Sequence, residues 1–369
     1  MDTKNFEVFF DCGSSKIKAG AFNKDNPNKF FFEESIFFDE TRSAETEIEK
    51  IVSLLEKNTN EYLNDVNLMI DSPNMLSIGL SISKKLDGSL LKKDDIQFLI
   101  QDAKQQILRN YFNQSIIHII IKNYKIDKDN YTFLPDNMTC NSISLDIIFI
   151  CIPKTIIEYF KERFLKLDIS INQIFSSSYA RSINYKNNFP LIGNIAFIDI
   201  GLNKTSITCF EYNEIIFFDI IPVGSNHISK DISKILKISL SEAENIKLNF
   251  DKDLNLLNEK ETSLDLIQQI IFARIEEILE LSSKSIRLNS SKSTEYKMIL
   301  MGNGSRILDN RFKEKISFSQ EIDLLEESLE DICKSGFNLF NRSNKQEVVI
   351  IPKKSAKTGF FEKLFHFFN

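Results

Sequence analysis

The chain has 369 residues, of which 42% are hydrophobic and 27% charged, and it carries a formal net charge of −6 at pH 7. The length allows two or three domains, and the balance of residue types is that of a globular protein, which excludes a collagen and a largely disordered chain. The negative charge argues against a nucleic-acid-binding protein, because such proteins carry a basic surface.

Cysteine usage and the apolar runs exclude further classes. The five cysteines show no metal-ligand spacing, which indicates reduced thiols in a cytoplasm. No apolar run reaches the ~20 residues that a membrane-spanning helix needs. The first residues lead into a strand, so we expect no signal peptide.

The N-terminal part of the chain alternates apolar strands with one helix. The helix is predicted over 45–60, where Ile48, Ile51 and Leu55 share one face at helical spacing. Polar residues at 71–74 predict a turn and a domain boundary. Strands are predicted at 7–10, 16–22, 29–38 and 67–71.

Residues 75–151 form a separate block in the pattern. A first strand ends at the turn Asp87-Gly88, and a helix is predicted over 93–109. Two further strands are predicted at 115–122 and 142–151. We therefore expect an inserted βαββ subdomain, after which the chain returns to its first domain.

The remainder of the chain again mixes helices and strands. Residues 155–185 predict a helix, a short strand and a second helix. Further helices are predicted at 225–235, 241–248 and 263–282, and further strands at 214–223 and 297–301.

One short sequence occurs twice, about half a chain apart. The pattern Asp-x-Gly-x-x-Lys begins at Asp11 and again at Asp199, and in both copies Phe follows six residues after the lysine. Each copy lies between two apolar strands. The repeat therefore predicts two β-hairpins that carry their polar groups at the turn.

The two turns suit a chain of phosphates. Glycine lets the backbone approach an anion, and successive N–H groups of a turn surround its oxygens. The two aspartates would hold Mg²⁺ through water molecules, because this ion keeps much of its water shell. A single such turn is usually structural, but two in register predict a clamp. The candidates are Asp11, Gly13, Ser14, Ser15 and Lys16 in the first turn, and Asp199, Gly201, Asn203, Lys204 and Thr205 in the second.

Three later segments are candidates for the rest of a nucleotide site. The first starts a helix, where a serine or asparagine side chain would cap the N-terminus. The second places a carboxylate and an ammonium on one helix face, a spacing typical of a surface ion pair. The third is a glycine-rich turn against which a ring or ribose could lie. These candidates are Gly224, Ser225, Asn226, Glu244, Lys247, Gly302, Asn303, Gly304 and Ser305.

The end of the chain predicts a membrane anchor. Residues 341–358 are polar and basic and predict a flexible linker. At about 100° per residue, 359–369 form a helix with separate aromatic and polar faces, too short to span a bilayer but suited to its anionic surface. The alternative is a terminal helix that packs on its own domain. The apolar face consists of Phe360, Phe361, Leu364, Phe365, Phe367 and Phe368.

Taken in order, these segments resemble the actin-like ATPase superfamily, and within it the FtsA family of bacterial cell-division proteins. The first turn resembles the first phosphate motif of that family, and the stretch 221–231 resembles the one after its second. Ala243-Glu244-x-x-Lys247 and 273–277 resemble its next two helices. The block 75–151 stands where that family carries its own subdomain, 1C.

The resemblance implies an α/β, actin-like two-lobed ATPase fold of duplicated RNase H-like halves, with an inserted 1C subdomain and a C-terminal amphipathic helix. The implied boundaries are 1–74 and 152–190 for the core of lobe 1 (1A), 75–151 for 1C, 191–227 and 295–340 for the core of lobe 2 (2A), 228–294 for subdomain 2B, 341–358 for the linker and 359–369 for the membrane helix.

The resemblance also implies the ligands. ATP with Mg²⁺ is the expected cofactor, with Glu244 and Lys247 at the ribose and residues 302–305 at the adenine and ribose. Leu202 stands where the family usually has glycine, so we expect weaker phosphate binding or a shifted loop. No residue is evident that would position an attacking water, and we expect slow hydrolysis or none.

The implied function is that of a scaffold. It would form filaments, help to recruit the division machinery and tether the tubulin-like division protein FtsZ to the cytoplasmic face of the cell membrane at the septum. The C-terminal peptide of FtsZ would dock on residues 228–294. A type IV pilus assembly adaptor of the same fold and a sugar-kinase-like phosphotransferase are the alternatives.

Overall fold

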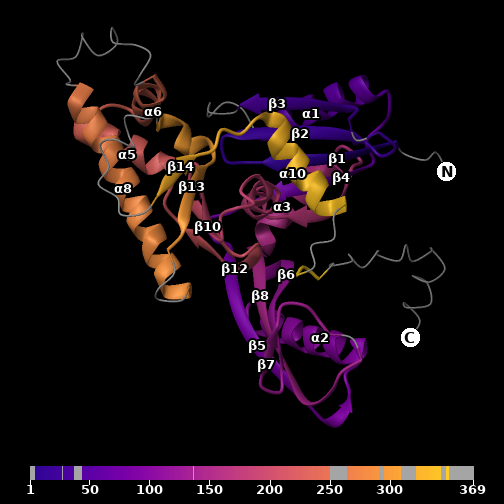
Figure 1. Ribbon diagram of the computed structural model, residues 1–369. Helices are drawn as coiled ribbons and strands as arrows, with labels where there is room; N and C mark the ends of the chain where they lie inside the picture. The colour runs from indigo at the N-terminus through magenta and orange to yellow at the C-terminus, as the bar shows by residue number, and fades with distance from the viewer. Residues whose placement is uncertain are drawn as a thin grey trace.

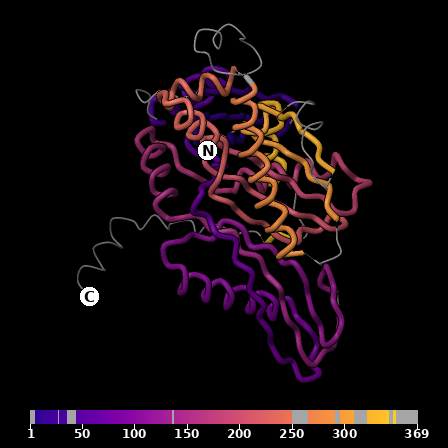
Figure 2. The backbone as a smooth tube through the Cα atoms, turned by 90° about the vertical axis from the view of Figure 1, so that its left-hand side faces the viewer, coloured from indigo at the N-terminus to yellow at the C-terminus, as the bar shows by residue number. Residues whose placement is uncertain are grey.

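A computed structural model describes residues 5–26, 28–36, 44–135, 137–249, 264–290, 295–308, 321–341 and 346–348. In this part of the chain, three β-sheets organise the molecule. Two of them form neighbouring lobes, and the third belongs to a smaller block that projects away from both lobes in two perpendicular views (Figures 1 and 2).

The first lobe is built on a five-stranded sheet with the order β3-β2-β1-β4-β9. Helix α1 (Ala44–Thr59) packs against β2 and β3, and its stripe of Ile48, Ile51 and Leu55 is buried as predicted. Helices α3 (Lys154–Leu165) and α4 (Ser177–Tyr185) belong to the same lobe. The strands are β1 (Phe6–Cys12), β2 (Lys16–Asn23), β3 (Phe30–Ile36), β4 (Asp65–Ile70) and β9 (Ser170–Phe175).

The second lobe repeats this sheet, with the order β12-β11-β10-β13-β14. In each lobe the first strand pairs antiparallel with the second and parallel with a later one, so Asp11 lies opposite Met69 and Asp199 opposite Met301. The duplication seen in the sequence is therefore a duplication of topology. The strands are β10 (Asn194–Ile200), β11 (Thr205–Glu211), β12 (Glu214–Ile221), β13 (Lys297–Met301) and β14 (Ile322–Leu324).

Three helices cover the second lobe on the side away from the first (Figure 1). They are α5 (Ser225–Leu236), α6 (Leu240–Asn249) and α8 (Leu264–Asn289). Isoleucines of α5 and α8 pack with the sheet in one buried cluster, because both helices place apolar residues at helical spacing on one face. Helix α5 carries the candidate Ser225, and α6 carries the candidates Glu244 and Lys247.

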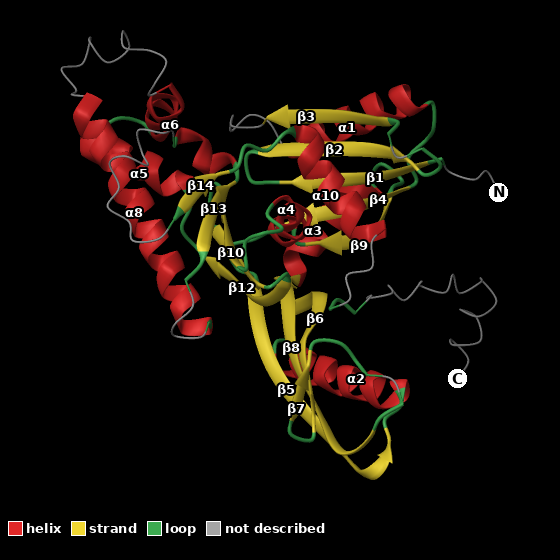
Figure 3. Cartoon of the chain, in the orientation of Figure 1, coloured by secondary structure: helices red, strands yellow, loops and turns green. Residues whose placement is uncertain are grey.

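The projecting block is a four-stranded sheet with the order β5-β8-β6-β7, and helix α2 (Lys93–Asn110) lies along it (Figure 3). The predicted turn Asp87-Gly88 interrupts the pairing without ending the strand: both residues have positive φ, and the register shifts between Lys85 and Ser89. The block has a buried core of its own. Its strands are β5 (Leu76–Leu90), β6 (Gln114–Ile126), β7 (Asp129–Tyr131) and β8 (Thr139–Pro153).

The last described helix, α10 (Leu329–Asn341), corrects the expected domain boundary. The sequence assigned it to the second lobe, but it packs on β1, β2 and α4 of the first and crosses in front of that sheet in Figure 3. Phe337 stacks on Phe22 with ring centroids 4.7 Å apart. A Cβ at Gly336 would overlap with Met69, so only glycine permits this close approach.

Residues 346–348 join the projecting block to the lobes. The Val348 N–H donates to the Ile119 carbonyl oxygen of β6 at 2.9 Å, and the Ile121 N–H donates to that of Gln346 at 2.7 Å. The Gln346 side chain accepts a bond from the Ile215 N–H of β12 at 3.0 Å. This short segment therefore contacts two of the three sheets directly.

No helix in the described ranges combines the length and apolar character needed to cross a membrane. All five cysteines are free and buried. The six apolar residues predicted to contact a membrane, from Phe360 to Phe368, lie outside the described residues, as does most of the predicted linker.

Candidate functional site

Both glycine turns line one cavity of about 480 Å³ between the two lobes. The predicted residues in its wall are Asp11, Gly13, Ser14, Ser15, Lys16, Asp199, Gly201, Asn203, Lys204, Ser225, Glu244, Lys247, Gly302, Asn303 and Gly304. Segments from five separate parts of the sequence thus meet at one place.

The two turns are closed by the same hydrogen bond. The Gly13 N–H donates to the Lys16 carbonyl oxygen at 2.9 Å, and the Gly201 N–H donates to that of Lys204, also at 2.9 Å. Each turn then leads directly into the second strand of its sheet. The sequence repeat therefore corresponds to two equivalent backbone loops at one cavity.

Four predicted residues support the wall without lining it: Thr205, Gly224, Asn226 and Ser305. The Thr205 hydroxyl donates to the Val223 carbonyl oxygen at 2.8 Å, and the Ser305 hydroxyl to that of Gly302 at 2.8 Å. The Asn226 amide holds the side chain of Asn203, a residue of the wall, at 3.1 Å. Their role is to fix the loops that do reach the cavity.

The second turn is bound to the start of α5. The N–H groups of Ser225 and Asn226 donate to the carbonyl oxygens of Gly201 and Leu202 at 2.9 and 2.8 Å. A Cβ at Gly224 would lie 2.6–2.7 Å from backbone atoms of this turn, so glycine is required by the close approach. The first N–H groups of the helix are thereby occupied by the protein itself.

Glu244 and Lys247 form a buried pair, not the surface pair that their spacing alone indicates. Lys247 is 3% exposed, and its Nζ donates to Glu244 Oε2 at 2.7 Å and to the Ser225 carbonyl oxygen at 3.2 Å. The Ser229 hydroxyl bonds the same carboxylate. Burial lowers the pKa of Lys247, although Glu244 acts in the opposite direction. The pair is therefore a preformed polar group at the wall of the cavity.

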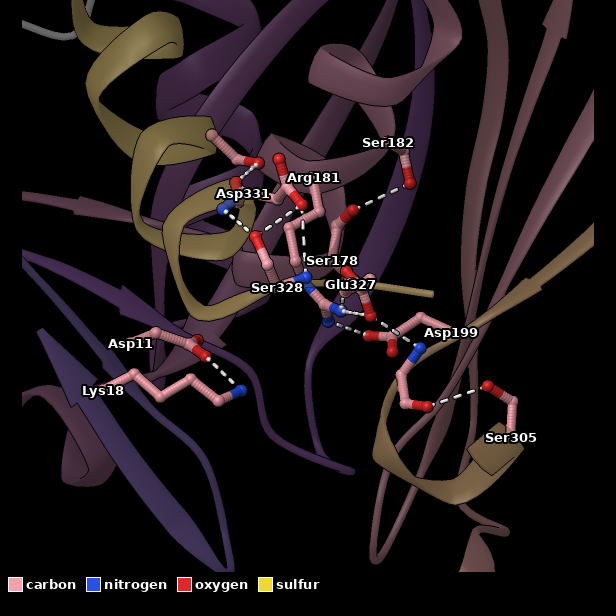
Figure 4. Close-up of polar contacts among 12 residues, drawn as sticks. Asp11, Lys18, Ser178, Arg181, Ser182, Asp199, Ser305, Glu327, Ser328 and Asp331 are labelled. Carbon is pink, nitrogen blue, oxygen red and sulfur yellow. Dashed lines mark hydrogen bonds and ion pairs between the residues drawn. The ribbon is translucent and has the colours of Figure 1, made fainter. Parts of the chain in front are cut away.

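An arginine that sequence reasoning missed lies at the centre of the site (Figure 4). Arg181, on α4, donates through Nη1 to both carboxylate oxygens of Glu327 at 2.9 Å and through Nη2 to Asp199 at 2.5 Å. Asp199 is the last but one residue of β10, so the guanidinium links the two lobes. Its Nε has no hydrogen-bond partner among the described residues.

Asp71 is a second missed residue, at the end of β4. Its carboxylate accepts bonds from the Ser176 hydroxyl at 2.7 Å and from the Ser178 N–H at 2.9 Å, and so it holds the start of α4. Lys204 of the other lobe lies 3.1 Å from the same carboxylate and 3.5 Å from that of Asp199. Lys204 of the second lobe thus contacts, through Asp71, the end of β4 in the first lobe and the carboxylate that holds the start of α4.

The protonation of this cluster follows its charges. Burial raises the pKa of Glu327, but the neighbouring Arg181 and the Gly302 N–H outweigh it and lower the value overall. The pKa of Asp71 is lowered in the same way, with Lys204 opposing burial. For Asp199 burial prevails and raises the pKa.

Charges of both signs line the cavity in similar numbers. The cations among the described residues are Lys16, Lys18, Arg181, Lys204, Lys247 and Arg306, and the carboxylates are Asp11, Asp71, Asp199, Glu244 and Glu327.

The expected Mg²⁺ site does not fit this arrangement. Asp11 faces Lys18 at 3.5 Å, and Asp199 faces both Arg181 and Lys204. Within the described ranges, no three or more histidine, cysteine, aspartate or glutamate side chains are grouped so that they could hold a metal ion. The carboxylates that would have to attract the ion are already neutralised by side chains.

Sequence comparison connects this site with a known family. The sequence model described as "Cell division protein FtsA" matches residues 196–342, which include the second turn, α5, α6, α8 and the glycine-rich turn after β13. The cell division protein FtsA of Buchnera aphidicola subsp. Acyrthosiphon pisum is 23% identical over 366 residues, covering 87% of this chain and 86% of that protein. The chain is thus similar to FtsA proteins over most of its length, and its second lobe matches the model of that family. FtsA of Bacillus subtilis is 27% identical over 217 residues, and this match covers 53% of the chain and about half, 48%, of that relative.

The structural comparison agrees on the fold. A solved PilM–PilN type IV pilus biogenesis complex matches with a TM-score of 0.61 at 10% identity, covering 88% of this chain and 89% of the other. At that identity the match concerns the fold alone. The chain has the α/β actin-like ATPase fold that the resemblance implies.

Proposed function

We propose that the cavity between the lobes binds ATP. The observation that carries this proposal is the pair of equivalent turns, closed by the bonds Gly13–Lys16 and Gly201–Lys204, in the wall of one cavity. Backbone N–H groups of such turns suit phosphate oxygens, and a volume of this size lies in the range of nucleotide pockets.

The remaining wall suits the nucleoside. The buried Glu244–Lys247 pair offers a fixed carboxylate and ammonium to the hydroxyl groups of a ribose. The turn that leads into η2 (Asn303–Ile307) offers backbone to the cavity at Gly302 and Gly304, while Arg306 and Ile307 of η2 add side chains to the wall. A Cβ at Gly302 would overlap with Asp199, so this turn requires glycine for its own close packing as well.

Nucleotide titration tests this part. A fluorescent ATP analogue should bind the full chain saturably, and Lys247→Met should weaken binding about tenfold, the loss of one charge-assisted bond. Lys234→Met, on the exposed side of α5, is the matched control and should leave the affinity unchanged. Equal affinities of the wild type and Lys247→Met would place the ligand elsewhere.

We further propose that the chain is a scaffold of cell division. Similarity to FtsA proteins supports this, and the resemblance suggests filaments that tether FtsZ to the cytoplasmic face of the cell membrane at the septum. Residues 359–369 would bind the anionic membrane as an amphipathic helix, and the FtsZ C-terminal peptide would dock on 228–294. The support for the membrane helix is the sequence pattern alone.

Co-sedimentation separates this function from its alternative. FtsZ should pellet with anionic vesicles only when the full chain is present. A pilus assembly adaptor is the second candidate, because the PilM–PilN complex shares the fold. If the chain does not bring FtsZ to vesicles, the pilus function is favoured instead.

A further inference from the structure

We infer that Arg181, with Lys18 and Lys204, takes the place beside Asp11 and Asp199 that a divalent metal ion would occupy, so that the nucleotide binds without such an ion. The inference rests on the proposed ATP binding and deepens it. It assigns to one side chain of α4 a role that the sequence repeat gave to Mg²⁺.

Asp199 is the carboxylate on which a metal ion would depend most, and it is enclosed on both sides. Its Oδ2 faces Arg181 at 2.5 Å and Lys204 at 3.5 Å. Its Oδ1 lies against the backbone of Gly302, where no room remains even for a Cβ. An ion, or a water molecule bound to it, would have to displace a guanidinium or an ammonium from this carboxylate.

The first turn has the same character. Asp11 and Lys18 lie opposite each other in the β1–β2 pairing, and their charged groups are 3.5 Å apart in the wall of the cavity. Both side chains are about nine-tenths buried, so water does little to separate them. Each aspartate of the repeat therefore has a cation of the protein where Mg²⁺ was expected.

Arg181 is built to remain in place and to accept an anion as well. Arg181 donates hydrogen bonds through Nη1 to Glu327 and through Nη2 to Asp199. These bonds fix the planar guanidinium where the two lobes meet (Figure 4). Arg181 is 7% exposed and its Nε is left without a partner among the described residues, although the side chain lines the cavity. The Nε itself is covered by protein atoms, so Arg181 would act on a phosphate through the fixed charge of its guanidinium, which stays protonated.

The alternative is that Arg181 only holds the lobes together. In that case Arg181 would stabilise the fold but would not replace the metal ion, and the nucleotide would still need Mg²⁺ to bind. The two possibilities therefore differ in how the affinity for ATP changes when the metal ion is removed. The wild-type protein is enough to measure this difference.

The experiment is calorimetric titration of ATP into the full-length wild type, once with excess MgCl₂ and once with EDTA. We expect affinities equal within about threefold. A loss of about tenfold or more in EDTA overturns the inference but leaves nucleotide binding intact. Absence of ATP binding under both conditions overturns the proposed nucleotide site and the inference with it.

A variant assigns the effect to the arginine. Arg181→Met combined with Glu327→Gln removes one cation and one carboxylate together, so the net buried charge is unchanged. Asp199 then keeps only Lys204, at 3.5 Å, as a neighbouring cation and can attract a metal ion more strongly. We expect ATP binding by this variant to be at least about tenfold weaker in EDTA than in MgCl₂. Metal-independent binding by the variant overturns the role of Arg181. Arg109→Met, exposed on α2, is the control and should behave as the wild type.

Discussion

Lys204 of the second lobe forms an ion pair of 3.1 Å with Asp71 of the first, and both side chains are at most one-tenth exposed. The pair joins the turn after β10 to the end of β4, two elements that are far apart in the chain. The lobes are therefore connected by charge as well as by their shared apolar core.

Lys204→Met should lower the free energy of unfolding by about 3 kcal/mol, because the carboxylate of Asp71 would stay buried without its counter-ion. Urea denaturation followed by circular dichroism measures the change. Lys16→Met is the control: its pair with Glu34 is 20% and 32% exposed, so we expect a loss within about 1 kcal/mol.

A double-mutant cycle then tests the pair itself. Asp71→Asn combined with Lys204→Met should cost clearly less than the sum of the two single substitutions, because the second change removes a group that the first has left unpaired. Additive losses would show that the two residues are not coupled and that the lobes are held by other contacts.

The stability of the fold should depend on the ionisation of Glu327. Its pKa lies below the ordinary value of 4.5, since Arg181 and the Gly302 N–H outweigh burial. A carboxyl with a lowered pKa in the folded state stabilises the fold above its unfolded pKa, and this contribution is lost as the pH falls through the folded value. We therefore expect the wild type to lose more stability than Glu327→Gln between about pH 6 and about pH 3.

Urea titrations of both proteins across this range provide the measurement. Other carboxyls, including Asp199 with its raised pKa, titrate in both proteins, so their effect largely cancels in the difference. Parallel stability curves for the two proteins would contradict an ionised, stabilising Glu327.

Gly224→Ala should separate α5 from the second turn. The added Cβ would lie 2.6–2.7 Å from the backbone at Gly201, Leu202 and Lys204, and we expect a loss of about 1–3 kcal/mol in unfolding free energy together with weaker ATP binding. Gly79→Ala is the matched control, because no atom lies within 4 Å of the Cβ it would add. A neutral effect at both positions would mean that the turn can move aside.

Deletion of 359–369 should abolish binding to anionic vesicles while the melting temperature stays unchanged. Phe361→Asp should have the same effect, since a charge on the apolar face is costly to bury in lipid. Asn369→Asp adds the same charge on the polar face and is the control for vesicle flotation. Unchanged flotation of Phe361→Asp would refute the predicted anchor.

Sequence reasoning identified the repeat because the chemistry of a phosphate turn is local. The six residues of Asp-x-Gly-x-x-Lys contain the glycine and both charged residues of the turn, and both copies of this motif line the cavity. Periodicity likewise located α1 and α2, whose apolar residues face a core.

The missed residues depend on contacts between distant segments. From the sequence, Asp71 was predicted to lie in a turn. The parallel pairing of β4 with β1 is what brings it to the cavity. Arg181 is the one charged residue in the segment 176–185, and that isolated charge was the available signal. Glu327 lies on the short connection between β14 of the second lobe and α10, which packs on the first lobe.

Element ends were misjudged where side chains replaced the usual signals. Helix α8 was expected to stop at residue 282, but it continues to Asn289. The Ser282 hydroxyl bonds the Ile278 carbonyl oxygen in the preceding turn, and Ser285 bonds Asp219 of β12. Serines that normally favour a helix end are here satisfied inside the helix.

The position of residues 346–348 has a mechanical consequence. A force applied to the chain beyond Val348 would act on the backbone hydrogen bonds of residues 346–348 to Ile119 and Ile121 of β6. It would also act on the contact of Glu347 with His118, which is 2.5 Å long. His118 in turn accepts the Ser176 N–H at the start of α4. A pull from the C-terminal end would therefore act first where the projecting block meets the first lobe. Two residues after Ser176, the Ser178 N–H donates to Asp71, the carboxylate that also pairs with Lys204 of the second lobe.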